Sequence, residues 1–171
     1  VQSPSTNGSW DTNATVKFGE AYSYKLSFMT GSTAVTNVVM FDTIEDGSDW
    51  HGTLTEVDVS WLQKKGYHPK VYLTTDKNAP NDITNDSWET LDSFTGTKPL
   101  ASAVRVAIAL EGDTVPGSSY VRAVLKMKAS ENENDVAGSA RDFYTVNFTN
   151  KEGIAMSLTS GEVSALLADT Y

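Results

Sequence analysis

The chain has 171 residues, enough for one domain that buries a core without covalent staples. Its formal net charge is −9, so neither nucleic acid nor an anionic membrane surface is an expected partner. There is no cysteine, which excludes disulfides and thiolate metal sites. No stretch approaches the roughly 20 apolar residues that span a bilayer, so we also expect no membrane insertion.

The dominant period along the chain is two, which is typical of half-buried strands. In residues 22–28 the apolar side chains of Tyr22, Tyr24 and Leu26 alternate with polar ones, and residues 104–110 and 120–128 repeat the pattern. We expect strands at 14–18, 22–28, 35–43, 53–59, 70–74, 104–110, 120–128, 143–148, 154–158 and 162–168.

Two short helical turns interrupt this pattern. Residues 60–63 have capping-box spacing, and Gly66 can end the turn in a left-handed conformation. A second turn is expected at 86–92, capped by Asp86 or Ser87. Residues 75–87 indicate a long exposed loop, and residues 131–139 a polar hairpin tip or connection.

These elements predict an all-β fold, an antiparallel sandwich or barrel with one or two short helical turns. Because no repeat or linker interrupts the pattern, residues 1–171 are expected to form a single module. No signal-peptide pattern begins the chain, so we expect either a mature protein or an internal fragment of a longer protein. The predicted core contains Tyr24, Leu26, Val39, Phe41, Val106, Ile108, Leu125 and Met127.

The stretch FDTIEDGSDW, residues 41–50, concentrates four carboxylates after an apolar run. It can be interpreted as a catalytic acid pair, a weak cation site or a polar turn at the end of a strand. The spacing does not fit an EF-hand, whereas Asp-Gly after a strand is a common turn signal. The turn interpretation is favoured, and no catalytic residue is predicted.

Calcium is the one cofactor that the composition leaves open. The loop 76–92 contains Asp76, Asp82 and Asp86, whose oxygens could serve as ligands. Solvated loop acids are the commoner case, so no cofactor is expected. The two histidines, His51 and His68, show no metal-binding spacing.

Tryptophans in polar loops raise the alternative of carbohydrate binding. Trp50 and Trp88 lie among acidic residues, which suits an exposed platform for sugar rings. Trp61 lies inside a capped turn and is expected to close the end of the core. The sequence therefore leaves open a carbohydrate-binding module, attached to a glycoside hydrolase, as an alternative to a structural role.

The order of segments resembles a known group of proteins. VKFGEAYSYKLSF, AVTNVVMFDTIEDG, PLASAVRVAIAL and PGSSYVRAVLKMKA follow one another as in repeat modules of Gram-positive (Firmicutes) cell-wall-anchored adhesins. These modules are related to collagen-adhesin and pilin-type Ig-like domains, so with the resemblance we expect an all-β, Ig-like or jelly-roll-related antiparallel β-sandwich. In this resemblance Asp42 is the aspartate at the strand exit, and residues 45–47 form the turn after it.

The resemblance implies a location outside the cell, at the cell wall or surface. It also implies a non-catalytic structural or adhesive role, with neighbouring domains of the same chain as partners. A host protein or a glycan would be the ligand, and the sequence does not identify either one.

Modules of the resembled kind often carry a Lys–Asn isopeptide bond beside a buried acid. Asp42 matches the acid, Lys17 is the one candidate lysine in the first strand, and Asn147 is the nearest amide near the carboxyl end. Asp142 stands where the reacting asparagine would be aligned. With a single lysine and a displaced amide, we predict no isopeptide bond.

Overall fold

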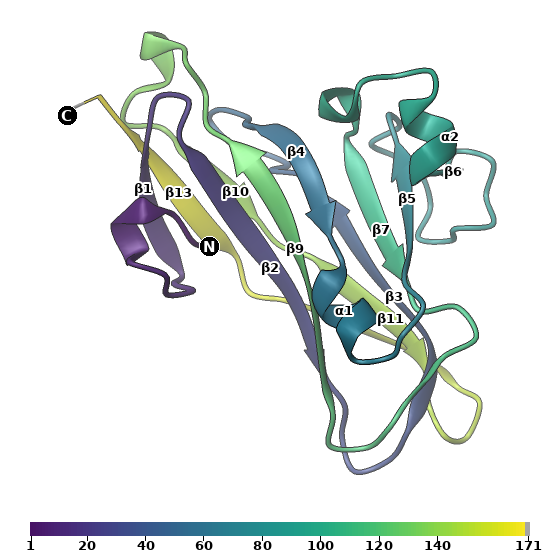
Figure 1. The fold of residues 1–171 in the computed structure, drawn as a ribbon. Helices are drawn as coiled ribbons and strands as arrows, with labels where there is room; N and C mark the ends of the chain where they lie inside the picture. Colours follow the sequence, from purple (N-terminus) through teal and green to yellow (C-terminus); the bar gives the residue numbers. More distant parts are fainter. Residues whose placement is uncertain (170–171) are drawn as a thin grey trace.

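The computed structural model describes residues 1–169, and Figure 1 shows its fold. The ten predicted strands are all present, with ends within two residues of those predicted. The elements in chain order are η1 (Pro4–Thr6), β1 (Asn13–Lys17), β2 (Ala21–Met29), β3 (Val35–Thr43), β4 (Thr53–Asp58), α1 (Ser60–Lys64), β5 (Lys70–Thr74), β6 (Glu89–Thr90), α2 (Leu91–Thr95), η2 (Leu100–Ser102), β7 (Arg105–Ala109), β8 (Thr114–Val115), β9 (Tyr120–Lys128), η3 (Glu133–Asp135), β10 (Ser139–Asp142), β11 (Thr145–Thr149), β12 (Ala155–Thr159) and β13 (Val163–Ala168).

Two antiparallel sheets form a β-sandwich. One has the strand order β2-β9-β4, and the other has the order β12-β11-β3-β7-β5-β6, with β8 paired to β3. Their facing sides carry the alternating apolar residues, because successive side chains of a strand point to opposite faces. Tyr24, Leu26, Leu125 and Met127 from the first sheet and Ile108 from the second are at most 1% exposed, as predicted.

Two members of the predicted core were placed on the wrong face of β3. The register pairs Met40 with Ile108 on the inner face, so Val39 and Phe41 point to the outer face. Phe41 is nevertheless 3% exposed, and Val39 is half-buried. They belong to a second apolar cluster, in which Phe41 is packed with Trp88.

The second cluster exists because the segment 75–88 covers the outer face of the sheet. The sequence predicts an exposed loop over 75–87, and that prediction is wrong in part, since Ala79 within it is 5% exposed; Trp88, directly after it, is 6% exposed. The backbone between them follows consecutive turns without regular structure. The loop therefore acts as a lid on β3 and β7.

A third, small sheet has the order β1-β13-β10. Its first pair is parallel, from Asn13 opposite Ser164 to Lys17 opposite Ala168. The predicted antiparallel β-sandwich is confirmed in the two main sheets, and the small sheet adds one parallel pair, in which the first and last strands lie side by side (Figure 1). β10 was not predicted, since residues 139–142 are too short and polar to show a clear period.

The two helical turns differ in how well they were predicted. α1 begins at Ser60, but the predicted capping box is absent, because the N-cap residue is Val59; the Ser60 amide donates to Asp58 Oδ1 at 2.9 Å instead. Gly66 follows with a φ of +90°, the left-handed conformation that ends the turn. α2 begins at Leu91 with Thr90 as its cap, several residues later than predicted.

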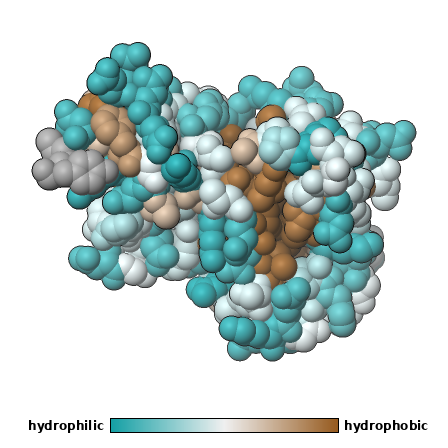
Figure 2. All heavy atoms as spheres, turned by 45° about the horizontal axis from the view of Figure 1, so that its top comes forward, coloured by the Kyte–Doolittle hydropathy of each residue, from teal (hydrophilic) through white to brown (hydrophobic). Residues whose placement is uncertain are grey.

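Polar side chains cover most of the surface in the view of Figure 2, apart from an apolar strip over the region of β4, β7 and β5 and a smaller apolar patch at the upper left. Among residues 1–169, no helix has the length and apolar character needed to cross a membrane.

Candidate functional site

The acidic stretch 41–50 begins in β3 and continues, after Thr43, as a tight turn over residues 44–47, and this turn inserts one carboxylate into the core. Glu45 adopts a φ of +52°, which is uncommon for a residue with a side chain. Its carboxylate is fully buried and accepts hydrogen bonds from the Tyr22 hydroxyl at 2.6 Å and the Tyr24 hydroxyl at 2.5 Å. The Gly52 amide donates to the other oxygen at 2.7 Å. The turn interpretation is thus right, but the sequence did not indicate that Glu45 is buried.

The three donors explain how a carboxylate is tolerated at this position. Burial raises the pKa of Glu45, whereas the hydrogen bonds from Tyr22, Tyr24 and Gly52 act in the opposite direction. The same burial, with the negative charge of Glu45, raises the pKa of both tyrosines far above the ordinary value. The tyrosines therefore remain protonated donors, and their alternate positions on β2 aim both hydroxyls at one acceptor.

Two more carboxyl groups lie beside Glu45. Asp42, at the end of β3, is fully buried, and Asp142, at the end of β10, is 3% exposed. Asp142 Oδ1 accepts from the Glu45 amide at 2.9 Å. Neither oxygen of Asp42 has a donor among the described residues, so a bond between the two aspartates forms only when one of them is protonated.

Burial raises the pKa of Asp42, and the nearby Glu45 charge adds to this effect. Burial also raises the pKa of Asp142, and the Asp42 charge adds to it. Two carboxylates that share a dry site cannot both ionise easily, so we assign one shared proton to the pair. The positive charge of Arg105 lowers the pKa of Asp42, but this effect is smaller than the increase caused by burial.

The rest of the acidic stretch connects the turn to β10. The Asp49 amide donates to the Ser139 carbonyl, and the Ser139 amide donates to the Asp49 carboxylate, both at 2.9 Å. Ser48 Oγ accepts from the Arg141 amide at 2.7 Å. Asp46 points outward and forms an ion pair with Lys77 at 2.7 Å. The stretch therefore acts as a structural junction between β3, β2 and β10.

The proposed sugar platform is not present. Trp50 and Trp88 are 2% and 6% exposed, so neither offers a ring face to a ligand. The Trp50 indole donates to the Gly138 carbonyl at 2.8 Å and packs edge-on against Tyr22. The expectation of exposure failed because polar neighbours in a loop do not reveal which surface the loop covers. Trp61 is partly buried against the core, as predicted.

Trp88 is held by Arg105, a residue that was not among the predicted site residues. The guanidinium lies 5.0 Å from the Trp88 ring centroid and 5.8 Å from that of Phe41. It also donates to the Ala79 carbonyl and to Asn81 Oδ1. Arg105 is the single charge in an apolar strand, and this was the signal for a buried partner.

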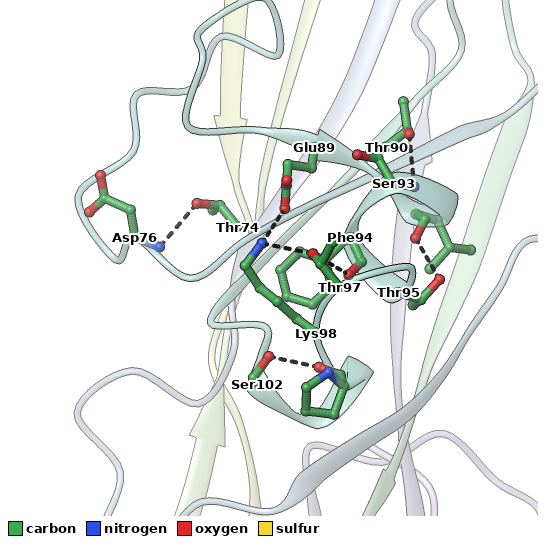
Figure 3. Close-up of polar contacts among 12 residues, drawn as sticks. Thr74, Asp76, Glu89, Thr90, Ser93, Phe94, Thr95, Thr97, Lys98 and Ser102 are labelled. Atoms are coloured by element: carbon green, nitrogen blue, oxygen red, sulfur yellow. Dashed lines mark hydrogen bonds and ion pairs between the residues drawn. The ribbon is translucent and has the colours of Figure 1, made fainter.

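The loop has two fixed ends (Figure 3). At its start, Thr74 Oγ1 accepts from the Asp76 amide at 3.0 Å. Beyond its end, Lys98 Nζ donates to Glu89 at 2.9 Å and lies 5.1 Å from the ring centroid of the buried Phe94. The loop is therefore anchored by packing and polar contacts on both sides.

Two of the three predicted calcium ligands, Asp76 and Asp82, accept hydrogen bonds from backbone amides of their own loop. Asp76 Oδ1 accepts from the Asn78 amide at 2.9 Å, and Asp82 Oδ1 accepts from the Thr84 amide at 3.0 Å. Asp86 is exposed. Within residues 1–169, no three acidic or histidine side chains are arranged to hold a metal ion. The structure thus gives no support to a calcium site at these three aspartates.

The isopeptide candidates are spread over different parts of the fold. Asn147 is opposite Val39, so it points to the outer face of the sheet, away from Asp42. Lys17 is opposite Ala168, whereas Asp142 is opposite Val163 on the other side of β13. Five residues along a strand correspond to about 16 Å. The absence of an isopeptide bond stays a prediction.

Asp142 also borders a cavity of about 430 Å³ at the edge of β2. Val1, Trp10, Tyr24, Lys25 and Tyr144 are among its other lining residues.

Comparison of the sequence with known protein families gives no match, and no curated protein matches it. Solved structures do match in fold. The major pilin subunit BcpA of Bacillus cereus is 11% identical with a TM-score of 0.49, over 91% of this chain and 37% of that one. The collagen-binding subdomain of the Enterococcus faecalis surface protein ACE is 10% identical with a TM-score of 0.40, over 87% and 88%.

The matches also include a family 123 glycoside hydrolase from Clostridium perfringens, 14% identical with a TM-score of 0.37, over 92% of this chain and 23% of that one. The chain is thus similar in structure to Gram-positive pilins and adhesins, at low identity, and spans little more than a third of the pilin. At these scores the likeness describes the arrangement of strands alone.

Proposed function

We propose that this chain is a non-catalytic structural module of an extracellular bacterial surface protein, and that it withstands tension between neighbouring domains. The observation that carries the proposal is the parallel pairing of β1 and β13, the first and last strands, over five residue pairs.

Parallel end strands determine how the module responds to a pull. The amino end of β1 and the carboxyl end of β13 lie at opposite ends of the same ladder. Tension between the two ends of the chain therefore slides the strands along each other and loads all their hydrogen bonds together. A pair loaded from one end would instead open one bond at a time.

The structural junction formed by residues 41–50 supports the same function. β13 pairs with β10 on its other side, and β10 is connected to the turn through Asp142, Arg141 and Ser139. Force on β13 is thereby passed to β2 and β3 through contacts of the Glu45 turn. The order of segments that resembles adhesin modules supports the surface location and the neighbouring domains. The alternative function, a carbohydrate-binding module, required exposed rings of Trp50 and Trp88, and both side chains are buried.

Force spectroscopy with two attachment geometries tests the proposal. In the first, single molecules are pulled between their two ends. In the second, the carboxyl-terminal attachment is moved to a cysteine at the exposed Glu162, just before β13, so that both attachments lie at one end of the β1–β13 ladder. The chain has no other cysteine, so the attachment is unique. We expect a clearly higher unfolding force in the first geometry, and equal forces would refute the proposal.

A further inference from the structure

The free edge of β2 has an alternating set of backbone partners. β2 pairs with β9 on one side only. On the other side, Ser23 and Gln2 exchange backbone hydrogen bonds at 2.8 and 2.9 Å. In an antiparallel ladder every second residue points its N–H and C=O away from the partner strand. Ser23, Lys25 and Ser27 therefore all present their backbone groups to this free edge.

Ser27 is satisfied by a side chain that imitates a strand. The Tyr144 hydroxyl accepts from the Ser27 amide at 3.0 Å and donates to the Ser27 carbonyl at 2.9 Å. Ser23 and Ser27 are thus both paired, one by Gln2 and the other by Tyr144.

Lys25, between them, is left open. Its backbone N–H and C=O have no partner among residues 1–169. Its side chain lies over the Trp10 ring, with Nζ 5.5 Å from the centroid. The cavity of about 430 Å³ borders Lys25 at this point, with Val1 and Tyr144 also in its lining. The free edge at Lys25 therefore offers one backbone donor and one backbone acceptor in strand geometry, beside a cavity large enough for another residue.

We propose that the Lys25 edge is a docking slot for one extended residue, supplied by the polypeptide that leads into Val1. This rests on the proposed function, in which the chain is a module within a longer polypeptide. The antiparallel bridge places Gln2 opposite Ser23, so Val1 is opposite Tyr24 and the residue before Val1 is opposite Lys25. That residue completes the edge with two backbone hydrogen bonds.

The same geometry limits the slot to one residue. The position opposite Ser27 is occupied by the Tyr144 hydroxyl, so the incoming chain must turn outward there. Docking also replaces the amino group of Val1, which is held against the Asp11 carbonyl at 2.7 Å, by a neutral amide. Burial lowers the pKa of this amino group, so a neutral amide suits the site better. The slot therefore connects the preceding segment to the central sheet at a defined point.

Amide hydrogen exchange in two extended proteins tests the slot. One carries Ser-Thr-Thr before Val1, and the other carries Ser-Thr-Pro, so that the docking residue lacks its N–H. Both remove the charge of the Val1 amine equally. The Ser23 and Ser27 amides, already bonded, are internal controls.

In the 171-residue chain, we expect the Lys25 amide to exchange much faster than those of Ser23 and Ser27. Either extension should slow Lys25 exchange by at least about tenfold, because both supply the carbonyl, and the threonine version should melt higher than the proline version. Lys25 protection in the unextended chain, or unchanged exchange on extension, would overturn the inference. Neither result depends on the unfolding force, so this test and that of the tension-bearing function can fail separately.

Discussion

The carboxyl groups of Asp42 and Asp142 meet inside the protein, one from the end of β3 and the other from the end of β10. Asp42 is fully buried, and no donor among the described residues reaches its oxygens. A proton shared by the two groups supplies the missing hydrogen bond. The stability of the module should therefore depend on pH in a particular direction.

Stability should fall as the pH rises from 5 to 8. The pKa of each aspartate is raised by burial, so the folded protein retains a proton that the unfolded chain has lost above its ordinary pKa of 3.8. Protonation is then favourable to folding at low pH, and the benefit is lost as the pH passes through the raised pKa. We expect a decrease of at least about 1 kcal/mol, or about 2–4 °C in Tm.

The variant Asp42→Asn removes the contribution of the shared proton to this slope, whereas Glu45, whose pKa is also raised by burial, keeps its own contribution. The introduced amide can donate to Asp142 at any pH, so the slope between pH 5 and 8 should flatten and the Tm at pH 8 should rise. The exposed Asp46→Asn, on the same turn, is the matched control and should keep the slope. A wild-type Tm that increases from pH 5 to pH 8 would show that the shared proton is wrongly assigned.

Gly52 is a sensitive position beside Glu45. A Cβ there would lie 2.0 Å from the Tyr22 hydroxyl and 2.8 Å from the Lys128 carbonyl. Gly52→Ala should therefore displace Tyr22 from Glu45 and destabilise the fold by about 1–3 kcal/mol in urea unfolding. Gly47→Ala, with open space around it but a φ of +73°, is the comparison for backbone strain alone. Gly52→Ala should be the more harmful of the two, and the reverse order would contradict the described packing.

The lid formed by residues 75–88 should loosen when its central cation is removed. Arg105→Met keeps much of the side-chain volume but loses the bonds to Ala79 and Asn81 and the charge over Trp88. Limited trypsin digestion should then cut faster after Lys77, an exposed site within the lid. Arg122→Met, on the other sheet, is the control. Equal cleavage rates would mean that Arg105 does not hold the lid.

The protein should have its full sequence mass. A Lys–Asn bond would lower the intact mass by one ammonia and a Lys–Asp bond by one water. The registers keep Lys17 at the far end of β13 from Asp142, and Asn147 faces outward. Mass spectrometry of the denatured chain should therefore show no loss. A loss that disappears in Lys17→Ala would prove the prediction wrong.

The period of two was sufficient to place the long strands, because side-chain alternation is a local property that survives in any β-sandwich. It could not tell which face of β3 was inner. Val38, Val39, Met40 and Phe41 are all apolar, since both faces are covered. The sequence did not reveal that residues 75–88 cover the outer face of β3, because Trp88 and Arg105 are distant along the chain and come into contact only in the folded protein.

The candidate site was predicted only in outline. Asp42 was expected at the strand exit and the Asp-Gly pair in a turn, and both are found there. The burial of Glu45 depends on two tyrosine hydroxyls from β2, and that of Asp142 on an unpredicted strand. Contacts between distant segments leave no pattern in either segment, so the acid cluster could not be derived from spacing.

The central claim is that the β1–β13 ladder resists tension, and a pair of proline variants tests it directly. Thr15 donates its amide to Ser5 Oγ, and Ser164 donates to the Thr12 carbonyl, so the Ala14 amide faces β13 whereas the Thr15 amide faces away. Ala14→Pro removes a ladder hydrogen bond, and Thr15→Pro removes one outside the ladder. In end-to-end pulling, we predict that Ala14→Pro lowers the unfolding force clearly more than Thr15→Pro does. Equal forces in the two variants, or a lower force in Thr15→Pro, would contradict the account.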